Sequence, residues 1–275
     1  MISELGLGGG RIGVDSGSMR YREIAAIQSV RPRVELHPVE AALEPLRLCK
    51  DDGEVACIRR AIRITESAME STLNRIQAGM TEKDVCRLIE IESLRGGADG
   101  MAFEPMVVSG PRSALQHVAP CLRELKAGDC VILDVGACSD GYRADITRTL
   151  SIGSPDQVTE RAHAVVLEAN QAARAAIRPG VSAGSVDGAA RVVIDNSEFR
   201  GRLIHGVGHG LGLDIHEPPI VASGASTILE PGMVFTVEPG VYLEGRMGVR
   251  VEDVAMVTAT GSEYLTTISR DLRVL

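Results

Sequence analysis

The chain repeats its own pattern once. The segment IQAGMT at residues 76–81 aligns with IRPGVS at 177–182, an offset of 101 residues. The segment GDCVILDVG at 128–136 aligns with GMVFTVEPG at 232–240, an offset of 104 residues. An internal repeat of this size predicts two similar halves that pack on each other, each with a helix pair and antiparallel strands. Chance similarity is the alternative, but the gap lengths and the carboxylate positions agree together.

The expected elements follow from hydrophobic periodicity. Apolar residues at helical spacing, ended by glycine or proline, indicate helices that begin near residues 51, 81, 157 and 182. Residues 81–84 (TEKD) have the form of a capping box, which supports a helix start at that point. Apolar runs predict strands over residues 106–108, 130–135 and 142–150. We expect a pseudo-two-fold axis to relate the two halves.

Four carboxylates occupy matched places in the two halves. Asp134 and Glu238 each interrupt an apolar, strand-like run. A second acid follows each of them, because Asp145 lies 11 residues after the first and Glu252 lies 14 residues after the second. Hydrogen bonds can satisfy one buried acid, but four acids brought together would repel and raise one another's pKa. Divalent metal ions would relieve that repulsion, so the pattern predicts a metal site between the halves.

The histidines are concentrated near the second pair of acids. Three of the six lie in the glycine-rich stretch 205–217, and a fourth precedes the first strand of the repeat; these candidates are His205, His209, His216 and His117. Glycine lets one backbone approach another closely, as a metal or substrate pocket requires. We interpret His37 and His163 as structural or solvent-facing residues.

The composition excludes several classes of protein. With 275 residues and 44% apolar content, the chain can bury a sizeable core, which argues against disorder. A net charge of −8 and 3% aromatic residues disfavour a nucleic-acid binder. The sequence has neither an 18-residue apolar run nor a signal-peptide pattern, so we expect no membrane association. Six cysteines without a C-x-x-C pair then favour a cytoplasmic protein with reduced thiols.

Five separated segments resemble the pita-bread metallopeptidases, a family that includes methionine aminopeptidases, Xaa-Pro aminopeptidases, Xaa-Pro dipeptidases (prolidases) and the metal-free creatinases. The segments are 132–136, 142–149, 205–218, 235–240 and 248–253. They stand in the order and spacing of the family, so the resemblance is specific, and it covers roughly residues 45–275. It implies an α+β pita-bread fold, in which two related halves form a curved sheet covered by helices.

The resemblance also implies five ligands for two divalent metal ions. Asp134 would bind one ion, whereas Asp145 and Glu252 would bridge the two. His209 and Glu238 would complete the second site. Four carboxylates with one imidazole form an oxygen-rich ligand set, unlike the thiolate set of a structural zinc site. This set favours Mn²⁺ and also suits Co²⁺ or Fe²⁺, with Zn²⁺ as a further alternative.

The same resemblance implies catalytic roles for other residues. A metal-bridging hydroxide would attack the scissile carbonyl, and Glu238 would pass a proton to the leaving nitrogen. His216 and His117 resemble the histidines that stabilise the tetrahedral intermediate and contact the substrate, with His205 a weaker candidate. Arg250 precedes an acid ligand by two residues on the same strand face, where it would orient that acid or a substrate carboxylate.

The residues that flank these motifs favour the Xaa-Pro branch of the family. This predicts a metallo-exopeptidase that hydrolyses the Xaa-Pro bond at peptide N-termini or in dipeptides. Its partners would be short proline-containing peptides, and a homodimer is compatible with the resemblance. The alternatives are a methionine aminopeptidase, a non-peptidase amidohydrolase, or a catalytically silent binding protein on the same fold.

Two departures from the Xaa-Pro branch concern the N-terminal region and the substrate pocket. Xaa-Pro enzymes carry a large N-terminal domain, so we interpret residues 1–45 as a remnant of a creatinase-like domain with its linker, irregular apart from a short strand at 11–15. The catalytic domain would then cover residues 46–275. Ile220 stands near the place where some prolidases have an arginine that binds a dipeptide carboxylate, which weakens a strict dipeptidase assignment.

Overall fold

The structure, a computed structural model, describes residues 10–116 and 118–275. The chain divides into two compact units, residues 1–47 and residues 48–275. The interpretation of the first unit as a remnant of a creatinase-like domain stays a prediction.

The first unit contains a strand-helix-strand motif followed by a second helix. Its elements are β1 (Gly10–Val14), α1 (Tyr21–Val30), β2 (Val34–Pro38) and α2 (Glu40–Leu48). β1 and β2 pair in parallel, with Ile12 opposite Leu36. The prediction that this region is largely irregular is therefore wrong. Its periodicity is weak because neither helix fully buries a side chain, and Pro45 lies inside α2 instead of ending it.

The second unit contains the two predicted halves, residues 51–153 (the first half) and residues 156–257 (the second half). The first half comprises α3 (Asp52–Leu73), α4 (Glu82–Arg95), β3 (Gly100–Met101), β4 (Met106–Ser109), the 3₁₀ turn η1 (Gly110–Ala114), β5 (Cys130–Val135), β6 (Ala137–Ser139), β7 (Tyr142–Arg143) and β8 (Ile146–Ser151). The second half comprises α5 (Gln157–Ala176), α6 (Ala183–Asp195), β9 (Gly208–Gly210), β10 (Glu217–Val221), β11 (Val234–Val237), β12 (Gly240–Leu243), β13 (Met247–Arg250) and β14 (Asp253–Val257). Two short strands follow, β15 (Ser262–Tyr264) and β16 (Arg273–Val274).

The four long helices begin where their capping residues stand. The predicted capping box is confirmed, since Thr81 accepts from the backbone N–H of Asp84 and Asp84 accepts in return. Asp51 caps α3 in the same way, while Asp156 and Ser182 cap α5 and α6. Local capping chemistry therefore fixes all four starts that the periodicity predicts.

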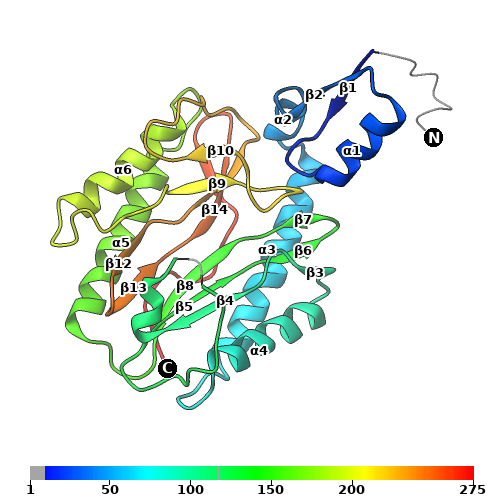
Figure 1. Cartoon of the computed structure of the whole chain (residues 1–275). Helices are drawn as coiled ribbons and strands as arrows, with labels where there is room; N and C mark the ends of the chain where they lie inside the picture. Colours follow the sequence, from blue (N-terminus) through cyan, green and yellow to red (C-terminus); the bar gives the residue numbers. More distant parts are fainter. Residues whose placement is uncertain (1–9, 117) are drawn as a thin grey trace. The chain divides into compact units, whose positions relative to one another are not determined.

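Each half packs an antiparallel sheet against its own helix pair. The sheet of the first half has the strand order β16-β8-β5-β4, with β16 parallel to β8, and that of the second half has the order β10-β9-β11-β14-β15. Figure 1 shows the pair α5 and α6 on one side of these strands and the pair α3 and α4 on the other. This is the α+β arrangement that the repeat predicts.

Two large hydrophobic clusters form the core of the second unit, and each is drawn mainly from one half with some side chains of the other. In the first, side chains of α3 and α4 such as Ile62 and Ile89 pack on β5 at Leu133. In the second, Val166 of α5 packs in a cluster that includes Phe235 of β11. All of these side chains are almost fully buried. Burial of apolar surface stabilises the fold by about 25 cal/mol for each Å² removed from water. The site residues lie between these two cores.

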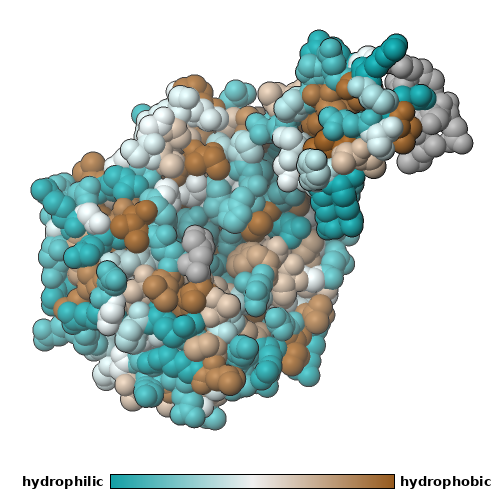
Figure 2. All heavy atoms as spheres, viewed as in Figure 1, coloured by the Kyte–Doolittle hydropathy of each residue, from teal (hydrophilic) through white to brown (hydrophobic). Residues whose placement is uncertain are grey.

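The described residues of the second unit include both hydrophobic and hydrophilic side chains at the surface. On the face shown in Figure 2, hydrophobic residues of this unit are scattered among hydrophilic ones. Within residues 10–116 and 118–275, no helix combines the length and the apolar character needed to cross a bilayer.

Candidate metal centre

The predicted ligands lie at or near strand ends of both halves and line one cavity of about 350 Å³. Its lining includes the acids Asp134, Asp145, Glu238 and Glu252, the histidines His205, His209 and His216, and Arg250. Asp134 lies on β5, and His209 lies on β9. The other three acids stand just outside the regular ladders, at the ends of β11, β8 and β14. His117 lies outside the described residues.

The glycines beside His209 allow its strand to enter the sheet. β9 pairs with β10 on one side and with β11 on the other. A Cβ atom at Gly208 would collide with the carbonyl oxygen of Thr236, and one at Gly210 would collide with that of Pro218. Only residues without a side chain fit between these two neighbours, which explains the glycine-rich sequence around the histidine.

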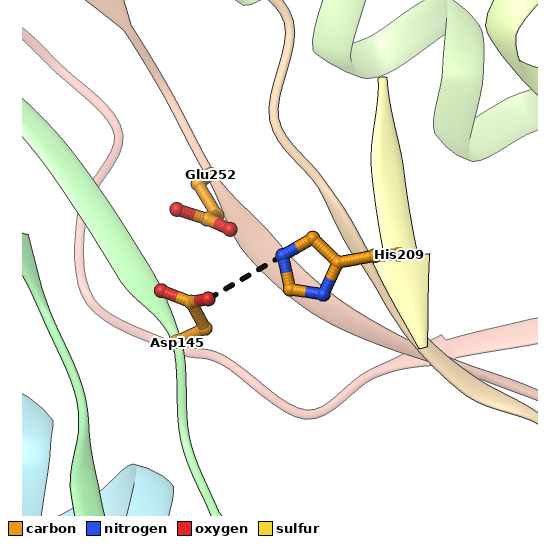
Figure 3. Close-up of side chains that lie close together, drawn as sticks. All are labelled: Asp145, His209 and Glu252. Carbon is orange, nitrogen blue, oxygen red and sulfur yellow. Dashed lines mark ion pairs between the residues drawn. The ribbon is translucent and has the colours of Figure 1, made fainter. Parts of the chain in front are cut away.

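Three of the predicted ligands form a compact group. Asp145, His209 and Glu252 each offer one ligand atom, and these atoms lie within 4.8 Å of one another, so the group could hold a metal ion. Figure 3 shows the three side chains pointing toward one another, with His209 Nε2 3.6 Å from Asp145 Oδ2. The same nitrogen lies 3.5 Å from Glu238 Oε1. Asp134 lines the same cavity from the other half.

Three carboxylate oxygens that face this cavity have the properties expected of cation ligands. Oδ1 of Asp134, Oδ1 of Asp145 and Oε1 of Glu252 are buried and have no hydrogen-bond partner within the described part of the chain. Buried polar atoms in proteins are nearly always hydrogen-bonded, so three unpartnered oxygens around one cavity require another partner. An oxygen-rich set with one imidazole suits a divalent cation.

Burial also sets the protonation of these groups. It raises the pKa of Asp145 well above its usual value, and the neighbouring charges of Glu252 and Asp134 raise it further. Burial likewise raises the pKa of Glu252 and that of Glu238, and the charge of Asp134 adds to both shifts. Burial lowers the pKa of His209, which favours the neutral imidazole that binds metals. Positive charge in the cavity would allow all four acids to ionise together.

Comparison with known proteins identifies the family. The model of metallopeptidase family M24 matches residues 56–259. The chain belongs to this family. A Xaa-Pro dipeptidase of Pyrococcus furiosus is 34% identical over 256 residues, which cover 93% of this chain and 74% of the relative.

Solved structures extend the comparison to the fold of this M24 chain. The X-Pro aminopeptidase from Thermotoga maritima is 35% identical with a TM-score of 0.94, over 100% of this chain and 76% of that one. A dipeptidase from Pyrococcus horikoshii is 38% identical with a TM-score of 0.95, again over 100% and 76% of the two chains. The M24 chain has the α+β pita-bread fold that its sequence resemblance implies.

Arg250 lies deep in this M24 site and contacts a different acid from the one that its sequence position suggests. Its Nη2 atom is 2.5 Å from Asp134 Oδ2, and its Nε donates to Thr147 Oγ1 at 3.1 Å. Thr147 in turn donates to Glu252 Oε2 at 2.6 Å. The guanidinium therefore orients Asp134 directly and reaches Glu252 through a hydroxyl.

The two remaining described histidines of the site are held by aromatic and polar contacts. The His205 ring shares a hydrogen bond of 2.9 Å between Nε2 and Tyr242 Oη, and Tyr242 also accepts from Arg250. The His216 ring packs edge-on against His209, with their centroids 4.3 Å apart. Sequence reasoning missed Thr147 and Tyr242, because neutral hydroxyl residues inside strand-like runs give no charge or spacing signal.

Proposed function

We propose that this protein is a dimetal exopeptidase that hydrolyses the bond between an N-terminal residue and proline. The observation that carries this proposal is the set of unpartnered buried carboxylate oxygens around one cavity of an M24 chain. Proteins named Xaa-Pro dipeptidase and X-Pro aminopeptidase are among its relatives. The residues proposed to hold the two ions, with Mn²⁺ as the first choice, are Asp134, Asp145, His209, Glu238 and Glu252.

The proposed chemistry divides between the ions and the side chains. When bound, divalent ions would lower the pKa of a water molecule and polarise the scissile carbonyl. Glu238 lines the cavity and accepts from Thr236 Oγ1 at 3.3 Å, and it would take a proton from the attacking water and transfer it to the leaving proline nitrogen. His209 stays neutral because burial lowers its pKa.

The walls of the cavity suit a small apolar residue beside a polarised carbonyl. Phe103, Ile215 and Ile220 line it together with His216 and His205. The apolar side chains can pack on a proline ring, and a ring nitrogen of His216 can donate to the carbonyl oxygen of the bond being cut. The volume of about 350 Å³ lies in the range of small-molecule binding sites.

The charges in the cavity favour peptides longer than two residues. Among the described residues that line it, Arg250 is the one lysine or arginine, and its guanidinium binds Asp134. A dipeptide would bring its terminal carboxylate close to the acids, without an arginine or lysine in the described lining to neutralise it. A longer peptide carries this charge outside the cavity. We therefore favour aminopeptidase activity over dipeptidase activity.

The decisive experiment is cleavage of a small peptide panel by Mn²⁺-loaded protein, with the Asp145→Ala variant as the inactive control. We expect Xaa-Pro tripeptides to be cleaved faster than Xaa-Pro dipeptides, and Met-Ala-Ser to be left intact. Preferred cleavage of Met-Ala-Ser would assign a methionine aminopeptidase instead. Equal turnover by Asp145→Ala would overturn the assignment of this site.

Location and assembly stay proposals of the same kind. We propose a cytoplasmic enzyme, which the six free cysteines support. We propose that it forms a homodimer. Light scattering on the purified protein measures the number of chains in the assembly directly.

A further inference from the structure

A single buried amide on α5 bridges the two strand ends that carry acids of the second half. Asn170 is fully buried. Its Nδ2 atom donates to the carbonyl oxygen of Val237 at 3.1 Å and to that of Val251 at 3.4 Å. These carbonyls belong to the residues immediately before Glu238 and Glu252. One side chain therefore contacts the backbone next to two of the proposed metal ligands.

The chemistry of the contact fixes the orientation of this amide. If Asn170 were flipped, its Oδ1 atom would face two carbonyl oxygens, and three acceptors would point at one another. In the orientation found, Oδ1 is buried and has no hydrogen-bond partner among the described residues. An unsatisfied buried acceptor is unfavourable, so the two contacts made by the other end of the amide outweigh it.

The carbonyls that Asn170 binds lie where the ladder is interrupted. Val237 is the last residue of β11, and Val251 lies in the gap between β13 and β14. Regular pairing of β11 with β14 stops at Val237. Beyond it, the N–H of Glu238 donates to Val207 O at 2.8 Å, that of Glu252 donates to Thr147 O at 3.1 Å, and that of Val251 reaches Pro239 O at a long 3.4 Å. The helix α5 packs against β11 and β13, and through Asn170 it adds a side-chain link between these two segments.

The first half uses a different solution at the equivalent helix position. With the repeat offset of 101 residues, Asn170 corresponds to Met69, a fully buried core residue of α3. Of the two acids in that half, Asp134 lies inside β5 and pairs with Thr147 on β8, whereas Asp145 stands just before β8. A continuous ladder positions Asp134, whereas its counterpart Glu238 stands beyond the end of β11, where Asn170 donates to the adjacent carbonyl.

We propose that Asn170 is a positioning residue that sets the spacing of Glu238 and Glu252 for divalent metal binding. The proposal rests on the metal site of the proposed function. Without the amide, the two strand ends separate or rotate, and the acids no longer meet one cation with the same geometry. Outer-shell partners of metal ligands typically change metal affinity by about 10- to 100-fold, and we expect Asn170 to act within that range.

The test compares Mn²⁺ binding by calorimetry in three proteins: wild type, Asn170→Leu and Val166→Ala. Leucine has a similar volume but no donors. Val166 lies one turn earlier on the same buried face of α5, so its truncation removes apolar packing but no hydrogen bond to the strand ends. We expect Asn170→Leu to weaken Mn²⁺ binding by about 10-fold or more and Val166→Ala to leave it within about twofold of wild type. The visible absorption of bound Co²⁺ should change in Asn170→Leu alone, because it reports ligand geometry.

Each other result has a definite meaning. Equal Mn²⁺ affinity in Asn170→Leu and wild type, with the same Co²⁺ spectrum, would overturn the positioning role while leaving the metal site intact. A wild-type protein that binds less than one Mn²⁺ would overturn the metal site and the positioning role with it. If Asn170→Leu does not fold, Asn170→Ser keeps one hydroxyl donor, and its affinity should fall below that of wild type. Wild-type affinity in a folded Asn170→Ser would count against the role.

Discussion

The two halves of the second unit share a backbone plan but differ in the charges at equivalent strand positions. By the repeat offset of 104, Leu133 corresponds to Val237. β5 pairs Leu133 with Arg148, and β11 pairs Val237 with Asp253. Arg148 and Asp253 are therefore equivalent positions with opposite charges. They bind each other, Nη2 to Oδ1, at 2.8 Å in the buried centre between the halves.

The same register shows where the metal-binding chemistry is asymmetric. Val131 of β5 pairs with Ser109, and its equivalent Phe235 of β11 pairs with Gly210. The residues just before these partners are Val108 and His209, so the position that carries an imidazole in the second half carries a buried valine in the first. The repeat thus gives both halves the same backbone arrangement, and different side chains at equivalent positions form a single site between them. Neither half contains the complete set of proposed ligands.

The largest expected effect comes from removing the imidazole that distinguishes the second half. His209→Ala should reduce metal-dependent peptide cleavage by more than about 100-fold, because even partners outside the ligand set typically cost 10- to 100-fold. The matched change in the first half is Val108→Ala, which should lose stability but keep the number of bound Mn²⁺ ions. Metal content and turnover of the two variants measure the asymmetry directly. Equal losses in both would contradict it.

The charge pair between the halves should make the next largest contribution. Arg148→Met leaves Arg270 as the charged partner of Asp253, beside the hydroxyl of Thr266. We expect the free energy of unfolding to fall by about 4 kcal/mol, as when a buried pair loses one partner. Arg161, whose pair with Glu198 is exposed, provides the control. Arg161→Met should unfold at nearly the wild-type urea concentration. Similar midpoints for the two variants would show that the buried pair does not join the halves.

A second buried pair joins the residue just before the first half to the histidine-bearing segment of the second. Lys50 Nζ lies 2.6 Å from Glu217 Oε1, and both side chains are nearly inaccessible, at 1% and 6% exposed. Lys50→Met should lower the free energy of unfolding by about 3 kcal/mol, and Lys50→Arg should lower it less because the charge is kept. Arg59→Met, which removes a half-exposed pair with Glu263, should cost less than about 1 kcal/mol.

Hydrogen exchange separates a local effect of Lys50 from a global one. Glu217 Oε2 accepts from the N–H of Asp214 at 3.4 Å, so the carboxylate organises the turn that carries His216. We expect Lys50→Met to increase exchange in residues 212–217 more than in α3. Uniform acceleration across the second unit would mean that the pair only adds to general stability.

The sequence predicts the features that depend on local patterns. The repeat, the four helix starts and the four acids all follow from periodicity, capping chemistry and the cost of burying charge. The assignment of Asp145, His209 and Glu252 as ligands stays a prediction, and the structure gathers them as that prediction requires.

The features that the sequence does not predict depend on register between distant strands. The spacing of the acids suggests that Asp145 and Glu252 are equivalent, but the ladder partner of Asp134 is Thr147, and Thr147 occupies the place of Glu252. The contacts of Asn170 and of Lys50 follow from tertiary packing, and no local sequence pattern predicts them. A buried amide or lysine looks like an ordinary surface residue in the sequence until its partner is known.

The smallest expected effect concerns His163 on α5, whose equivalent in the first half by the offset of 101 is the buried Ile62. Burial lowers the pKa of His163 below the ordinary value of 6.5, with Asp271 opposing the shift and Arg148 adding to it. Above pH 6.5 the histidine is neutral in both the folded and the unfolded chain, so its contribution is fully present. As the pH falls below 6.5 the unfolded chain binds the proton first, and stability is lost until the pH passes the folded pKa.

His163→Leu should remove this part of the pH dependence, at most about 1.4 kcal/mol per pH unit, in urea unfolding with a chelator present. His37→Leu, an exposed change in the first unit, should keep the wild-type slope for the second unit, and an unchanged slope in His163→Leu would assign the acid sensitivity to other groups.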